Sequence, residues 1–329
     1  MNNIQKLLSM SAITLLVAAC GAEDPTQSGF SQGLGKTVIT GQVQQGNVKD
    51  AQVFLDLNDN GVLDAGEPTA TAPTDAQGNF TLPLTSADAA KITPSSKIVS
   101  IGGTDTLNPA VKVGLLVSEV PDLTAGSATA TAAATTTITK HITPVTTLLA
   151  MAPDADTKGK LKDVIKELGG RDDCLIEGSS QAVIALTKST EMVLTTLQTS
   201  SGDDKGGRDL ARNAAREMAR SLSGKTAHEL TDTSTIATTL SNASGTAVAQ
   251  TPTATQLNVN GADLVAELKT GSLEVANAVK GSSGSGSLET TKGKSEAEVM
   301  TEKVKGQITD AVNTANTNIK QEVSPNKGK

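Results

Sequence analysis

The chain has 329 residues, which allows two domains at about one domain per 150 residues. It contains no Trp, no Tyr and only three Phe, so a core must be built from Val, Leu, Ile and Ala. This composition favours small β-domains and small-residue helix packing over one large enzyme core. The net charge of −7 and the lack of an aromatic stacking platform argue against nucleic acid as a partner.

The first nineteen residues have the proportions of a secretory signal: Lys6 precedes an apolar run from Leu7 to Ala19 that is too short to span a bilayer comfortably. The sequence Val17-Ala18-Ala19-Cys20 resembles the bacterial lipobox. That resemblance implies that Cys20 becomes the first mature residue and carries acyl chains such as palmitate. The alternative is that an ordinary signal peptidase cuts nearby and that Cys20 is incidental.

Gly21, rather than Asp, follows the cysteine. In Gram-negative lipoproteins this resemblance implies transport to the outer membrane. We therefore predict an exported lipoprotein anchored by its lipid to the outer membrane, on the periplasmic face or at the cell surface. If Cys20 is acylated, Cys174 has no partner within the chain, which indicates a buried free thiol or an intermolecular bond. Asp172 and Asp173 should raise the pKa of that thiol, so we interpret Cys174 as structural.

Residues 20–36 are polar and glycine-rich, which is typical of a flexible tether. Residues 37–120 follow as a β-rich region in which Gly, Pro and Asn separate short apolar runs. The expected strands are Thr37–Val43, Gln52–Leu55, Asn79–Leu84, Lys97–Ile101 and Val111–Val117.

Residues 56–67 read DLNDNGVLDAGE and fit the calcium-loop pattern D-x-[DN]-x-[DN]-G-x5-E at every specified position. Ca²⁺ takes oxygen ligands, and this spacing supplies them from alternate positions, with Gly61 allowing the sharp turn. The predicted metal ligands are Asp56, Asn58, Asn60, the backbone carbonyl of Val62, Asp64 and Glu67. The alternative is an acidic, Asn- and Gly-rich surface turn without a metal.

The loop should join β-strands rather than helices, because Val53 and Phe54 lie in a strand-like run and Pro68 and Pro73 follow it. The segment GQVQQGNVKDAQVFLDLNDNGVLDAGEPTATAPTDAQGNFTL resembles a prealbumin-like, carboxypeptidase-regulatory-like module of bacterial surface proteins. It is also similar to the calcium-loaded B-type modules of serine–aspartate-repeat adhesins. The resemblance implies an Ig- or prealbumin-like antiparallel β-sandwich with structural Ca²⁺.

The second half predicts helices, so the fold class expected overall is α+β. Residues 121–139 are Thr- and Ala-rich and predict a linker or an edge strand, and residues 140–280 form a mainly helical domain. A segment from Ile142 to Ala150 resembles one that often follows such β-modules in exported bacterial proteins. Residues 281–294 predict a Gly/Ser linker, and residues 295–329 predict an amphipathic helix and tail.

Four arginines recur at every fourth position of one predicted helix: Arg208, Arg212, Arg216 and Arg220. Such a stripe can bind phosphate, an anionic glycan or lipid headgroups. The alternative is a solvated face opposite Leu210, Ala214 and Met218, which is the usual role of charged runs on helices.

Motifs that carry catalysis are missing from the sequence: there is no HExxH, G-x-S-x-G, P-loop, dinucleotide fingerprint or CxxC. His141 and His228 lie in unrelated contexts. We therefore expect a non-enzymatic protein with a structural, adhesive or interaction role and a possible protein or glycan partner. The alternatives are a periplasmic binding or assembly factor whose helical region recognises a partner, and a hydrolase that carries the β-module as an accessory.

Overall fold

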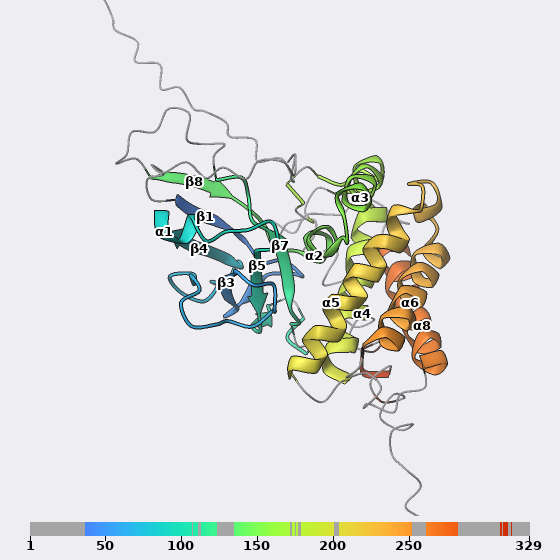
Figure 1. Ribbon diagram of the computed structural model, residues 1–329. Helices are drawn as coiled ribbons and strands as arrows, with labels where there is room; N and C mark the ends of the chain where they lie inside the picture. Colours follow the sequence, from blue (N-terminus) through green and yellow to red (C-terminus); the bar gives the residue numbers. More distant parts are fainter. Residues whose placement is uncertain are drawn as a thin grey trace, which may run out of the picture.

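The computed structural model describes residues 37–106, 108–110, 113–123, 135–171, 173–174, 176, 179–200, 204–251 and 261–281, with 310, 312–314 and 317 near the end. Strands occupy the first part of this range and helices the second, so the predicted α+β class is confirmed (Figure 1). The predicted signal peptide, Cys20, the tether and almost all of the Gly/Ser linker lie outside the described residues.

The strands form two three-stranded sheets and one short two-stranded pair. In the first sheet, β1 (Thr37–Gln42) lies between β4 (Asn79–Leu84) and β8 (Thr136–Thr139). In the second, β5 (Lys97–Ile101) lies between β3 (Gln52–Asp56) and β7 (Leu116–Glu119), and both pairings are antiparallel. The short pair joins β2 (Val48–Lys49) to β6 (Thr104–Asp105).

Two expectations about the strands need correction. Strand β8 pairs with β1 in parallel, so the prediction of a purely antiparallel module is wrong at this edge. Residues 136–139 form an edge strand, which is one of the two alternatives predicted for residues 121–139. The expected strand from Val111 to Val117 is displaced, since β7 begins at Leu116. A physical reason is that the Leu115 amide donates to Gln198 Oε1 at 2.8 Å instead of to a neighbouring strand.

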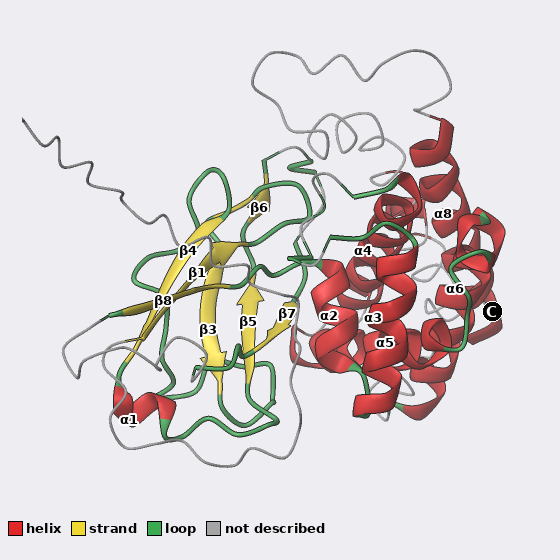
Figure 2. Cartoon of the chain, turned by 90° about the horizontal axis from the view of Figure 1, so that it is seen from above, coloured by secondary structure: helices red, strands yellow, loops and turns green. Residues whose placement is uncertain are grey.

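The sheet β3-β5-β7 is buried on both faces. Side chains alternate along a strand, so Val53, Leu55 and Ile98 share one hydrophobic cluster with Ile39 and Leu82 of the first sheet. The opposite face, with Phe54, Val99 and Val117, joins the cluster of the helical half. The second sheet therefore lies between the first sheet and the helices (Figures 1 and 2).

The helical half lies on one side of the strands, as Figure 2 shows. Its helices are α2 (Pro144–Met151), α3 (Ala155–Glu167), α4 (Gln181–Ser200), α5 (Asp204–Ser223), α6 (Thr233–Gln250) and α8 (Gly261–Gly281). Two shorter elements are α1 (Ser86–Ala89), in the β-rich part, and the 3-10 turn η2 (Glu229–Thr231). The side chains of Thr143, Asp154 and Asp232 cap the starts of α2, α3 and α6.

Helix α4 is the centre of the helical half, because it contacts α2, α5, α6 and α8 and its residues 187–197 are all buried. Of the predicted terminal amphipathic helix, the described residues are helical, and Val312 is buried in the same cluster as α4. Within the ranges that the structure describes, no helix combines the length and apolarity needed to cross a membrane.

Candidate calcium loop and its contact with helix α5

The candidate calcium loop, residues 56–67, begins at the last residue of β3. Asp56 is fully buried there, and the Leu55 amide donates to the carbonyl of Pro68 at 2.9 Å, which closes the base of the loop. Beyond the base, Phe54 forms an isolated bridge with Thr69. The expectation that no helix flanks the loop is confirmed.

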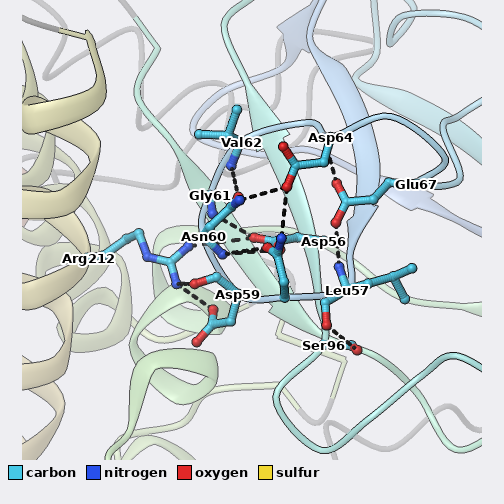
Figure 3. Close-up of polar contacts among 11 residues, drawn as sticks. Asp56, Leu57, Asp59, Asn60, Gly61, Val62, Asp64, Glu67, Ser96 and Arg212 are labelled. Carbon is cyan, nitrogen blue, oxygen red and sulfur yellow. Dashed lines mark hydrogen bonds and ion pairs between the residues drawn. The ribbon is translucent and has the colours of Figure 1, made fainter.

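The carboxylate of Asp56 organises the first half of the loop (Figure 3). The amide of Gly61 donates to Asp56 Oδ2 at 2.7 Å, and the amide of Asn60 donates to Oδ1 at 3.2 Å. The Val62 amide donates to Asn60 Oδ1 at 2.7 Å in the same way. The two bonds to Asp56 thus hold the chain in a tight turn around one carboxylate.

The second half of the loop is held by Glu67 and Asp64. The amides of Leu57 and Asp64 donate to the two carboxylate oxygens of Glu67, at 2.7 and 3.0 Å respectively. Asp64 Oδ2 accepts from the side-chain amides of Asn58 at 2.8 Å and Asn60 at 2.7 Å. The loop thus brings together the nominated side chains of Asp56, Asn60, Asp64 and Glu67 (Figure 3). Asn58 joins them through its hydrogen bond to Asp64.

The residues present fit a calcium ion in the chemistry of their donors, since the set consists of carboxylate, amide and backbone oxygens. Gly61 has φ of +71°, the left-handed conformation that this position of the loop requires. The amide nitrogens of Asn58 and Asn60 face Asp64, so both amides must turn over to present oxygen to an ion. Among the described residues, no group of three or more His, Cys, Asp or Glu side chains is arranged to hold a metal.

Arg212 of α5 reaches across to this loop. Its Nη2 donates to the Asp59 carbonyl at 2.6 Å and also to Asp59 Oδ1, while Nη1 lies 3.7 Å from Asp56 Oδ2 (Figure 3). The side chain is 7 % exposed. Sequence reasoning placed Arg212 in a stripe with three other arginines, and the four-residue spacing carried no signal that this one is buried.

The other arginines of the stripe have different surroundings. Arg216 donates to Asn213 Oδ1 at 3.1 Å, and Arg220 donates to both carboxylate oxygens of Glu217. Arg208 is half-buried, and its Nε has no hydrogen-bond partner. Anion binding by the stripe stays a prediction.

The sequence analysis also missed a buried pair of ionisable side chains in α4. Lys188 Nζ lies 2.9 Å from Glu191 Oε2, both side chains are almost fully buried, and Lys188 also donates to the carbonyl of Gln45. Burial, with a smaller contribution from Asp105, raises the pKa of Glu191 to about 7, and Lys188 opposes that rise. The three-residue spacing of Lys188 and Glu191 in a Thr-rich helix does not indicate that the two side chains are buried.

Cys174 is disulfide-bonded in the structure, and the chain contains two cysteines in all. The expectation of a free buried thiol or an intermolecular bond at Cys174 therefore does not agree with the structure. Acylation of Cys20 stays a prediction. A thioether-linked lipid and a disulfide within the chain would both need the sulfur of Cys20, so the two are mutually exclusive.

The two histidines lie away from the candidate calcium loop and in different parts of the chain. The ring Nδ1 of His141 accepts from the Gln42 amide at 3.2 Å, and burial lowers the pKa of His141. His228 is exposed and precedes η2.

Comparison of the chain with protein-family models, with curated proteins and with solved structures finds no match.

Proposed function

We propose that this chain is a non-enzymatic, calcium-stabilised lipoprotein, exported and anchored to the outer membrane through Cys20, with a structural, adhesive or interaction role. The observation that carries the proposal is the loop of residues 56–67. Asp56 and Glu67 accept backbone amides of the loop, and Asp64 accepts the side-chain amides of Asn58 and Asn60. The loop begins at Asp56, the fully buried last residue of its strand.

Calcium would act mechanically in this role. The β-rich half has few aromatic side chains, so its strands bury limited apolar area, and an ion held by Asp56 and Glu67 would join the two ends of the loop. Extracellular calcium at about millimolar concentration lies at or above the dissociation constants of extracellular calcium modules, about 0.1 to 1 mM. The stabilisation would then be present outside the cell and lost when the ion is removed.

The finer fold belongs to the same proposal. We take the two three-stranded sheets as the halves of a prealbumin-like sandwich, because side chains from both contribute to one hydrophobic cluster. The helical half would present the interaction surface for a protein or glycan partner. Its α5 face, with Arg208, Arg216 and Arg220, is the candidate surface for an anionic one.

The test is a thermal melt in calcium and in chelator. Wild-type protein should melt at a higher temperature in calcium, and Asp56→Ala combined with Glu67→Ala should abolish that rise. Asp75→Ala is the matched control, because Asp75 also accepts backbone amides in an exposed turn but lies outside the loop. A rise that persists in the double variant would place the ion elsewhere, and no rise in wild-type protein would overturn the calcium proposal.

A further inference from the structure

Arg212 contacts the calcium loop at Asp59, a position that the calcium-loop pattern does not assign as a metal ligand. Its two bonds go to Asp59, which lies between the predicted ligands Asn58 and Asn60. The same guanidinium lies close to Asp56, the first predicted ligand, and Nη1 makes no hydrogen bond. Arg212 therefore contributes a buried positive charge next to the site without blocking its ligands by a direct bond.

Gly61 makes this approach possible. A Cβ atom at Gly61 would lie 2.8 Å from Arg212 Nη1 and 3.2 Å from Leu115. Because Gly61 has no side chain, it can adopt the left-handed conformation that the turn needs. It also leaves room for the guanidinium of Arg212 to pack against the loop.

The orientation of the ligand side chains does not depend on Arg212. Asp56 and Glu67 are each held by two backbone amides of the loop itself. Removing the guanidinium would leave these bonds in place, so its effect on a divalent cation is mainly electrostatic. Like charges repel strongly where burial excludes water, and salt screens such buried charges poorly.

We propose that Arg212 is a charge-tuning latch: it holds the loop on α5 and opposes calcium, so that occupancy of the loop and the contact with α5 are coupled. This inference rests on the proposed calcium site. Coupling between two equilibria is reciprocal, so whatever Arg212 does to calcium affinity, calcium does to the bonds that Arg212 makes. Calcium therefore loosens the contact of Arg212 with Asp59, so the attachment of the loop to α5 depends on whether the loop holds an ion.

The experiment is a titration of calcium into the whole mature chain and three variants. Arg212→Met should tighten calcium binding by about fivefold or more, the lower end of typical coupling between sites. Arg212→Lys keeps the charge, so its calcium affinity should stay close to that of wild type and well below that of Arg212→Met. Arg220→Met is the matched control on the same helix, because Arg220 pairs with Glu217 in a largely exposed position, and its affinity should not change.

A second measurement uses the wild-type chain and guards against a variant that fails to fold. The guanidinium Nε–H of Arg212, identified by its absence from the Arg212→Lys spectrum, should exchange with solvent faster in calcium than in chelator. Unchanged exchange, or an Arg212→Met affinity equal to or weaker than wild type, overturns the latch and leaves the calcium site standing. Absence of binding by every chain, wild type included, overturns the calcium site and the latch with it.

Discussion

At the scale of single residues, Glu191 has the clearest consequence for pH. It is buried beside Lys188, and its pKa is raised from 4.5 to about 7, chiefly by burial. The folded state therefore holds a proton on Glu191 that the unfolded state releases between these two values. Stability from this group is fully present below pH 4.5 and declines as pH rises toward 7.

Glu191→Gln should remove this pH dependence. A raised pKa of this size corresponds to about 3 kcal/mol between the two ends of the interval. We expect the free energy of unfolding of wild-type protein, relative to Glu191→Gln, to fall by about that amount between pH 5 and pH 8. Denaturant titrations at several pH values give the difference, and parallel curves for the two proteins would contradict the account.

The candidate site could be predicted at this scale only in part. The identities at residues 56–67 were sufficient to nominate the ligands, because the loop pattern depends on local spacing. Arg212 and Asp59 are separated by 153 positions in the sequence, so their contact depends on how α5 docks, which spacing does not reveal. Lys188 and Glu191 were missed for the same reason: their partners Gln45 and Asp105 come from the other half of the chain.

At the scale of elements, the start of α2 explains a segment whose role the sequence did not show. Thr143 and Thr146 form a capping box around Pro144, which starts the helix. The same helix covers the edge of the second sheet: the Val117 amide donates to Thr147 Oγ1 at 2.9 Å, and Thr146 Oγ1 donates to the Val117 carbonyl at 2.9 Å. The two threonine hydroxyls thus pair the backbone amide and carbonyl of Val117 on edge strand β7, which would otherwise lack hydrogen-bond partners.

Thr147→Val should leave the buried Val117 amide without its partner. An unsatisfied buried donor costs about 1–3 kcal/mol, and the near-equal volume of valine limits any packing contribution. Thr187→Val is the matched control, since Thr187 is also fully buried but its hydroxyl donates only to Val183 in its own helix. Denaturant unfolding should show a loss for Thr147→Val that clearly exceeds that of the control; equal losses would contradict the edge-covering role.

Strand and helix positions were largely predictable because apolar spacing is a local signal. Strands β3, β4 and β5 lie where Gly-bounded apolar runs placed them, and helices α3, α4, α5 and α8 follow apolar positions at helical spacing. Helix α6 lies within residues 140–280, which were predicted to be mainly helical, although its Thr- and Ser-rich sequence has low intrinsic helix propensity. Tertiary packing against α5 and α8 overrides that preference.

At the scale of the whole molecule, the two halves share a core. The largest hydrophobic cluster contains Phe54, Val99 and Val117 from the second sheet together with residues of α2 to α8. Polar contacts cross the same boundary, from Lys158 to Glu119 and from Arg212 to Asp59. The sequence suggested a β-module followed by an independent helical domain, but the continuous run Val53–Leu55 is apolar because the sheet it belongs to is covered on both faces.

Anchoring of the whole molecule makes a prediction about thiols. If Cys20 carries a lipid, Cys174 has no partner within the chain, so the denatured, membrane-extracted monomer should react with one equivalent of a thiol reagent without reduction. Mass spectrometry should find acyl chains on the N-terminal peptide. Cys20→Ser, which cannot be lipidated at this position, should appear in the soluble fraction. No reactive thiol and no acyl mass would contradict the lipid anchor and favour the disulfide that the structure shows.

Calorimetric titration of calcium into the chain from Gly21 onward decides whether residues 56–67 form a calcium site. We expect one ion bound per chain, and loss of that binding in Asp56→Ala combined with Glu67→Ala. If calcium at concentrations of several times the roughly millimolar extracellular level produces only the heat of dilution, the calcium site is contradicted. The loop of residues 56–67 would then be an acidic turn held by its own hydrogen bonds and by Arg212.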